Sequence, residues 1–434
     1  MMHHLGTIGR SGETVMRCFK KTVVRTVAMM YGCPYAFMSS VTEWFYGKTN
    51  SKCGRTALYR CKKPMLSGAV LALLMISVLA SGCSMADWQM KSPLQKTVAA
   101  PPLFDIHVPR ADTPEAIDKE LDARYERVKK DTDKLFTQEQ GQLVLKHKYG
   151  TTVLPKNPQR VVVIRLEDPM VALGAPMVGA YNTPTFYLHD ELVAQGVQTI
   201  SINEETKAIN LEQVQALKPD LILLRDSFDR NTYNTLSKIA PVGALNLQKT
   251  EVALLALGRI LHREDQADTR LKQYYSHVKA SRLAIKGAIG NASVALLRVL
   301  KKEVRLYPYQ SNEISRFMYE LLNIQPDPLA ISQNGAESSI ISLEMLPELK
   351  AQYLIVSSGY GPSSSGNTAA AEKRYEELQA DPLWQVIPAV REGHILNVNP
   401  LVWNAHGIIA KERAMDDMVG YFSTHHVGDV SVSQ

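Results

Sequence analysis

The chain has 434 residues and a formal net charge of +6. That charge is unevenly distributed. Residues 1–82 hold eleven Lys and Arg but two Asp and Glu, so residues 83–434 carry 38 basic and 41 acidic side chains, a net charge of −3. The longer part therefore lacks the basic footprint of a nucleic-acid-binding protein. The last cysteine is residue 83, so no disulfide can stabilise the fold of the residues after it, and packing alone must do so. These roughly 350 residues are enough for two lobes of ordinary size.

Residues 1–64 form a basic leader that contains four of the five cysteines and shows no clear periodicity. Signal peptides rarely carry so long a leader. We therefore expect translation to begin nearer Leu58 or Met65. A genuine cytoplasmic extension is the alternative.

Residues 65–82 are uncharged and follow a basic flank at residues 60–63. This apolar run is short for a membrane span and fits the hydrophobic region of a signal peptide. Small residues lead from it to Cys83, a pattern that resembles a bacterial lipoprotein signal, although Ala80 stands where Leu is commoner. The resemblance implies cleavage before Cys83 and a lipid on its thiol. An uncleaved transmembrane anchor is the alternative, and both place the remainder outside the cytoplasm.

Residues 83–145 are predicted to be the lipid anchor and a tether. The segment is interrupted by Pro93, Pro101, Pro102, Pro109 and Pro114. Charged residues dominate 113–138, so we predict a solvated helix there and a simple spacer role for the whole segment.

Apolar runs then alternate with helical patterns. Strands are predicted at residues 160–165, 177–180, 220–224, 292–299 and 353–356. Helices are predicted at 169–174, 210–218, 313–322, 342–349 and 406–422, with helical signals almost unbroken over 251–286. This order predicts an α/β fold of two Rossmann-like lobes with largely parallel sheets, at 146–262 and 289–427, joined by one long helix at 263–288.

An internal repeat relates the two lobes. Asn210 and Ser342 each stand where a helix cap is expected, and Glu212 and Glu344 each follow as the second helical residue. Stabilisation of the helix dipole can explain one such acid. The same acid in both lobes also suggests matched contacts for a two-fold symmetric partner.

The order of several short motifs resembles a known family over residues 149–422. These motifs are Asn157-Pro-Gln-Arg160, Ala172-Leu-Gly-Ala-Pro-Met-Val-Gly179, Asn210-Leu-Glu212, Ile341-Ser-Leu-Glu344, Asp381-Pro-Leu-Trp384 and Val390-Arg-Glu-Gly393. The chain resembles the lipid-anchored substrate-binding proteins of ABC importers for iron-siderophores, haem and cobalamin. The resemblance implies a monomer without cofactor or catalytic residues. It also implies a ligand cleft between the lobes, and a permease whose arginines meet Glu212 and Glu344.

Candidate ligand contacts follow predicted strands, because ligands of open parallel sheets gather at the carboxyl ends of the strands. Arginines bind carboxylate or catecholate oxygens, and aromatic rings supply stacking area. The candidates are Arg165, Tyr181, Tyr187, Arg225, Arg298, Arg305, Tyr307, Tyr360, Trp403 and His406. They suit a large, anionic, partly flat ligand, which makes a ferric siderophore the leading prediction.

Structural interpretations compete with these assignments. Arg165 can pair with Glu167 or Asp168, Arg225 can pair with Asp226, and Tyr181, Tyr187 and Trp403 can be packing residues. Arg298 and Arg305 are favoured because members of the resembled family often carry basic residues after this strand.

Other chemistries find little support. The sequence has no glycine-rich phosphate loop with Lys and Ser or Thr, no nucleophile elbow and no paired zinc-binding histidines. Alternatives within the resembled fold are haem, with His406 as a possible iron ligand, or cobalamin. A surface sensor or interaction module without a transport role is the alternative of another class.

The lipoprotein prediction is testable in the native host. The mature protein should begin at Cys83, partition into detergent and carry acyl chains, whereas Cys83→Ala should remain an uncleaved precursor. Intact-mass analysis reports both outcomes, and an unmodified residue 83 in the parent would refute the assignment.

Overall fold

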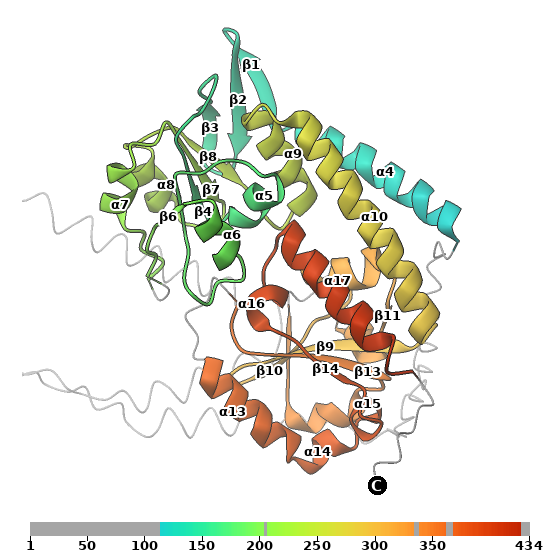
Figure 1. The fold of residues 1–434 in the computed structure, drawn as a ribbon. Coiled ribbons are helices and arrows are strands. Elements are labelled where there is room, and N and C mark those ends of the chain that lie inside the picture. Colours follow the sequence, from blue (N-terminus) through green and yellow to red (C-terminus); the bar gives the residue numbers. More distant parts are fainter. Residues whose placement is uncertain (1–112, 204–205, 334–337, 362–367, 427–434) are drawn as a thin grey trace, which may run out of the picture. The chain divides into compact units, whose positions relative to one another are not determined.

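The computed structural model describes residues 113–203, 206–333, 338–361 and 368–426 (Figure 1). Cys83, and the leader and signal segments predicted at residues 1–82, lie outside these ranges, as do tether residues 84–112. The described residues form the predicted α/β fold of two lobes, each built on its own sheet. No helix within these ranges is both long and apolar enough to span a bilayer.

The N-terminal lobe is built on a parallel five-stranded sheet with the order β6-β5-β4-β7-β8. Its strands are β4 (Val161–Ile164), β5 (Gly179–Ala180), β6 (Gln198–Thr199), β7 (Leu221–Arg225) and β8 (Val242–Leu245). Its helices are α5 (Glu167–Ala172), α6 (His189–Ala194), α7 (Leu211–Ala216), α8 (Arg230–Leu236) and α9 (Thr250–Ile260). The three strands predicted for this lobe are confirmed, and every residue of β4 and β8 is buried, as expected when helices cover both faces.

The C-terminal lobe has a mixed six-stranded sheet with the order β12-β10-β9-β13-β14, and β11 also pairs with β9. The strands are β9 (Ser293–Val299), β10 (Val304–Leu306), β11 (Gln325–Pro326), β12 (Ser339–Ile341), β13 (Tyr353–Ser358) and β14 (Ile395–Asn397). The helices are α11 (Glu313–Ser315), the π-helix η2 (Arg316–Leu321), α12 (Pro328–Ser332), the 3-10 helix η3 (Leu343–Glu348), α13 (Thr368–Gln379), α14 (Pro382–Gln385), α15 (Pro388–Arg391), α16 (Pro400–Trp403) and α17 (Ile408–Phe422). Because β10 runs antiparallel to its neighbours, this sheet is largely but not wholly parallel.

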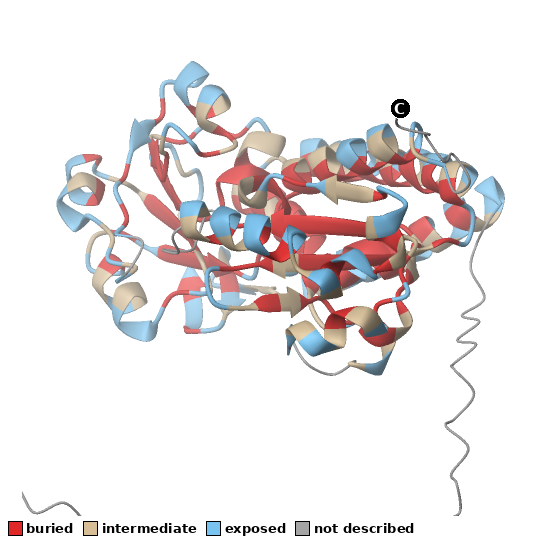
Figure 2. Cartoon of the chain, turned by 90° about the horizontal axis from the view of Figure 1, so that it is seen from below, coloured by how far each residue is buried: buried red, intermediate tan, exposed pale blue. Residues whose placement is uncertain are grey.

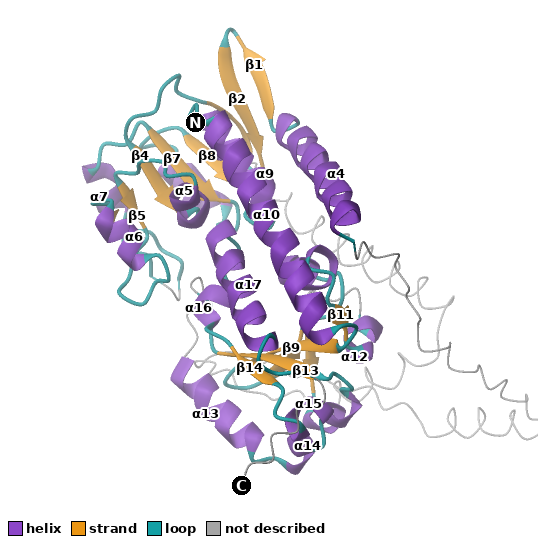
Figure 3. Cartoon of the chain, turned by 45° about the vertical axis from the view of Figure 1, so that its right-hand side comes forward, coloured by secondary structure: helices purple, strands orange, loops and turns teal. Residues whose placement is uncertain are grey.

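The long helix between the lobes is α10 (Glu264–Ile289), beside which α17 packs (Figure 3). The nearly unbroken helical run predicted over residues 251–286 is wrong at one point, because α9 ends at Ile260 and α10 begins at Glu264. His262 has a positive φ of 54° at this corner.

Glycine permits the close approach of α9 and α10, because a Cβ on Gly258 would lie 2.5 Å from the Cβ of Ala267. Figure 2 shows buried residues along the sheets and the inner faces of these helices.

The helix predicted as solvated is packed against the lobe, which corrects the spacer interpretation. Helix α4 (Pro114–Asp133) begins at a Thr113 cap and buries Ile117, Leu121 and Val128 against α9 and α10. These residues stand four and seven apart, so they share one face of the helix despite the surrounding charges. After it, β1 (Phe136–Glu139), β2 (Gln142–His147) and β3 (Gly150–Val153) form an antiparallel sheet. Residues 114–145 therefore belong to the folded body.

Ion pairs fix α4 along its length. Arg124 donates two hydrogen bonds, of 2.8 and 2.9 Å, to the buried carboxylate of Glu251 on α9. One turn earlier, Glu120 accepts a 3.0 Å hydrogen bond from Arg282 of α10, whose side chain is 4% exposed. Buried charges of this kind require their partners, so α4 is needed for both neighbouring helices.

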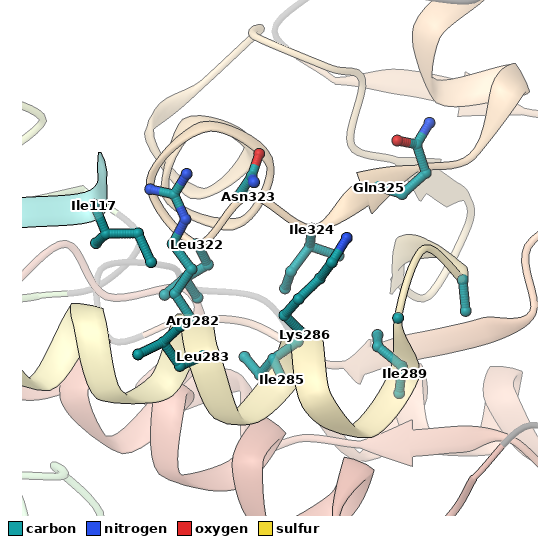
Figure 4. Close-up of a pocket in the computed structure, with 12 residues that line it drawn as sticks. Ile117, Arg282, Leu283, Ile285, Lys286, Ile289, Leu322, Asn323, Ile324 and Gln325 are labelled. Atoms are coloured by element: carbon teal, nitrogen blue, oxygen red, sulfur yellow. The ribbon is translucent and has the colours of Figure 1, made fainter. Parts of the chain in front are cut away.

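A narrow crevice lies between the C-terminal half of α10 and the turn at residues 322–325 (Figure 4). Ile117 of α4 and Arg282 of α10 line it, and its volume is about 10 Å³. That space holds about one water molecule. The crevice is therefore a packing defect beside α4 rather than a ligand site.

Candidate functional site

Two arginines stand side by side where β4 and β7 end. Ile164 pairs with Leu224 across these parallel strands, so the next residues, Arg165 and Arg225, meet at the carboxyl edge of the sheet. Both line a small cavity with Tyr187 and with His406 of the C-terminal part. The cavity has a volume of about 30 Å³. Four of the ten predicted ligand contacts therefore line one cavity at the carboxyl edge of the sheet, where ligands of parallel sheets are expected.

Arg165 is held by its backbone as well as by its side chain. Its φ of 61° is left-handed, which is uncommon for a residue other than glycine and stores strain. Its N–H donates a 2.9 Å hydrogen bond to Oε1 of Glu167, and the N–H of Tyr181 donates to the same oxygen at 3.2 Å. The guanidinium carbon lies 3.6 Å from the centre of the Tyr181 ring, a cation–π contact.

Arg225, unlike Arg165, has a guanidinium without a bonded partner among the described residues. Within the described part of the chain, no hydrogen bond or ion pair engages its guanidinium, so the predicted structural pairing with Asp226 does not occur at hydrogen-bond distance. Burial lowers the Arg225 pKa, partly against the attraction of Asp226. An arginine so placed can still donate its N–H groups to an anion.

Asp168 links the cavity to the C-terminal helix. Its carboxylate accepts hydrogen bonds from the backbone N–H groups of Ile409 and Ala410, each 3.0 Å, and from the Tyr187 hydroxyl at 2.8 Å. Burial raises the Asp168 pKa, and these donors oppose that rise. The carboxylate therefore caps the positive end of α17 and fixes the Tyr187 ring.

A second buried network stands behind His406. Glu313 pairs with Lys411, and its Oε2 lies 3.2 Å from Nδ1 of His406. Thr250 donates to the His406 carbonyl at 3.2 Å and accepts from Lys411 at 3.1 Å. Burial alone would raise the Glu313 pKa, but Lys411 and His406 outweigh it and hold the pKa at about 2. The cluster fixes His406 at the wall of the cavity.

The C-terminal lobe has its own arginine pair. Arg298 of β9 is the direct partner of Arg305 of β10, so both side chains leave the same face of the sheet. Arg298 donates to the Gly359 carbonyl at 3.1 Å and lies 5.8 Å from the Tyr360 ring. Arg305 forms an ion pair with Glu303, 2.6 Å from Nε to carboxylate. Neither arginine lines the cavity of Arg165 and Arg225.

Two aromatic residues predicted to contact the ligand, Trp403 and Tyr307, are buried side chains of the core. Trp403 is 3% exposed and donates its indole N–H to Asp417 of α17 at 2.8 Å, so it occupies the core, one of its two predicted positions. Tyr307 is also buried, and its hydroxyl donates to Asn404 at 3.3 Å. Neither lines the cavity of Arg165 and Arg225.

The repeated acids stand at exposed helix starts, but the two helices differ. Glu212 is on α7, which Asn210 caps with a 3.1 Å hydrogen bond to the Gln213 N–H. Glu344 is on the 3-10 helix η3, where the predicted Ser342 side-chain cap is absent. Instead, a hydrogen bond with Ser342 lowers the Glu344 pKa. Pro347 lies inside η3 and removes a backbone donor, which accounts for the irregular helix.

Sequence reasoning missed the acids that organise the site. Glu167 and Asp168 were considered only as partners of Arg165, and Glu313 was not considered. Their signal was available, because Glu167 and Asp168 directly follow the end of a buried strand. An acid at that place lies next to the other strand-end residues.

Comparison with known proteins agrees with this geometry. Residues 169–400, more than half of the chain, match the family model described as periplasmic binding protein. The chain belongs to this family. The Bacillus subtilis "Probable siderophore-binding lipoprotein YfiY" is 28% identical over 304 residues, covering 64% of this chain and 87% of the relative. The Escherichia coli "Fe(3+) dicitrate-binding periplasmic protein FecB" is 28% identical over 293 residues, covering 64% and 89%.

Solved structures support the fold of this periplasmic binding protein. Staphylococcus aureus SirA complexed with staphyloferrin B aligns with a TM-score of 0.55 and 25% identity. The alignment covers 64% of this chain and 97% of SirA. The two proteins therefore share a fold over nearly the whole length of SirA.

The contact between Asp168 and α17 yields a prediction for this binding protein. A Cβ at Gly407 would lie 1.8 Å from Cγ of Asp168, so Gly407→Ala should force the carboxylate away from the helix. We expect a loss of about 1–3 kcal/mol in the free energy of unfolding, measured by urea titration. Gly420→Ala is the matched control, because a Cβ there meets no atom within 4 Å. If Gly407→Ala is as stable as the control, the Asp168 contact is not a structural constraint.

Proposed function

We propose that this chain captures a ferric siderophore outside the cytoplasm and delivers it to the permease of an ABC importer. The observation that carries the proposal is Arg225, whose guanidinium has no hydrogen-bond partner among the described residues and lies beside Arg165 in a cavity that both lobes line. The family and the printed names of the two curated relatives support the same cargo.

The arginines of the site favour an anionic iron chelate, because the two acids of the same cavity, Glu167 and Asp168, already accept hydrogen bonds from backbone and hydroxyl donors. Arg165 and Arg225 project from one lobe, and Arg298 and Arg305 from the other. Guanidinium groups bind oxyanions through paired hydrogen bonds, and the Tyr187 ring supplies apolar wall. Pockets that bind small molecules have volumes of about 300–1,000 Å³. Because the cavity measures about 30 Å³, we expect the residues around it to separate when the ligand enters.

Binding can be tested by intrinsic fluorescence quenching of residues 83–434 with ferric dicitrate, a ferric hydroxamate, a ferric catecholate, haem and cobalamin. We expect saturable binding of a ferric siderophore. Arg225→Ala should weaken it by about 2–5 kcal/mol, the range for truncating one partner of a buried charge pair. Arg298→Ala and Arg305→Ala should weaken it as well if both lobes hold the ligand.

Lys238→Ala is a suitable control, because Lys238 is exposed and lies outside the cavity. Binding of haem with a Soret band, or of cobalamin, in place of every siderophore would change the assigned cargo. Unchanged siderophore affinity in all three arginine variants would refute the assigned site.

Delivery is proposed to depend on Glu212 and Glu344, and membrane attachment on a lipid at Cys83. Both glutamates are exposed, and neither lines the cavity of Arg165 and Arg225. Their carboxylates are therefore available to arginines of a permease, where such charges mainly guide encounter and orientation.

The docking proposal predicts a separation of two properties. Glu212→Ala combined with Glu344→Ala should leave siderophore affinity unchanged and sharply reduce iron uptake by cells. A role confined to the helix dipole predicts instead a loss of about 0.3–1 kcal/mol in stability per site with normal transport. Binding, melting temperature and uptake measured on the same double variant distinguish the two, and normal uptake at normal expression would refute docking.

A further inference from the structure

The left-handed backbone of Arg165 is bonded to a nearby buried acid, Glu167. Glu167 stands two residues later and is buried, with 3% of its surface exposed. Its Oε1 accepts the N–H of Arg165 at 2.9 Å and the N–H of Tyr181 at 3.2 Å. One oxygen thus joins the residue after β4 to the residue after β5.

The consequence is a fixed orientation for the Arg165 side chain. Tyr181 is held by the same carboxylate that bends the backbone at Arg165, and the guanidinium carbon lies 3.6 Å from the Tyr181 ring centre. Without Glu167, two N–H groups would lose an acceptor in a buried place, which is unfavourable. The strained φ of 61° would then have no compensating contact from this side chain.

We infer that Glu167 is a positioning residue for ligand binding, which acts through Arg165 by setting the strand-end backbone that stacks the guanidinium on Tyr181. This inference rests on the proposed capture of an anionic iron chelate. The charge of Glu167 alone would have the opposite effect, because it partly offsets the positive potential of Arg165 and Arg225. Positioning and charge can therefore be separated by substitution.

Three variants separate the roles. Glu167→Gln keeps an oxygen acceptor without the charge, Glu167→Asp keeps the charge but shortens the reach, and Glu167→Ala removes both. Asp229→Ala is the matched control, because Asp229 caps α8 with a 2.7 Å hydrogen bond to the Thr232 N–H and lies outside the cavity. Melting temperature is measured for all four, so that loss of folding is recognised.

The first readout needs no ligand. The Arg165 Nε–H signal in NMR, assigned by its disappearance in Arg165→Lys, should be shifted upfield by the ring current of Tyr181. We expect this shift to collapse in Glu167→Ala and Glu167→Asp but to persist in Glu167→Gln and Asp229→Ala. A shift that persists in Glu167→Ala and Glu167→Asp would overturn the inference.

The second readout is affinity for ferric dicitrate or for the siderophore that the parent binds most tightly. Glu167→Ala should weaken binding about tenfold, the size expected for one lost hydrogen bond to a charged group. Glu167→Gln should recover most of that loss. In an Arg165→Ala background, Glu167→Ala should cause no further loss. An equal loss in that background would show that Glu167 does not act through Arg165, and would overturn the inference.

The two proposals fail in different ways. If the parent binds none of the tested chelates, the proposed function fails while the NMR readout still decides whether Glu167 positions Arg165. If the parent binds and the Glu167 variants behave like Asp229→Ala in both readouts, the positioning role fails and the proposed function stands.

Discussion

The burial of one carboxylate, that of Asp168, constrains the arrangement around the cavity of Arg165 and Arg225. A buried carboxylate is very unfavourable unless donors surround it, and here the donors come from the start of α17 and from Tyr187. The helix that supplies two of them also packs along α10. The position of the cavity wall at Tyr187 and the course of the long C-terminal helix are therefore determined by the same contact. Gly407 provides the space in which this contact forms.

The two arginine pairs differ in how their charges are balanced. In the C-terminal lobe, Glu303 is paired with Arg305, and Arg298 bonds a carbonyl oxygen. In the N-terminal lobe, Glu167 bonds backbone donors, so its charge opposes Arg165 and Arg225 only through space. The Arg225 guanidinium, which has no hydrogen-bond partner among the described residues, thus keeps its donors for an external anion.

The sequence was sufficient to predict the strands, because a short run of β-branched and other apolar residues such as Val161–Ile164 is typical of a strand buried on both faces. It also predicted that Arg165 and Arg225 follow strand ends, and the pairing of β4 with β7 brings the two together. The partner of Asp168 could not be predicted in this way, because it lies 241 residues away along the chain. The fixed place of His406 depends on Glu313, 93 residues earlier. Trp403 was ambiguous because its burial is decided by Asp417 on another helix.

Helix α4 also bears on where the folded domain begins. Its apolar face is complementary to α9 and α10, and its charges neutralise Glu251 and Arg282, both buried. A shortened chain that starts at residue 146 would remove the ion-pair partners of those two charges and expose a hydrophobic strip along the linking helix. It would also cut through β2 and free the edge of β3. Such a fragment would be prone to self-association, so the folded unit must begin at helix α4 rather than at residue 146.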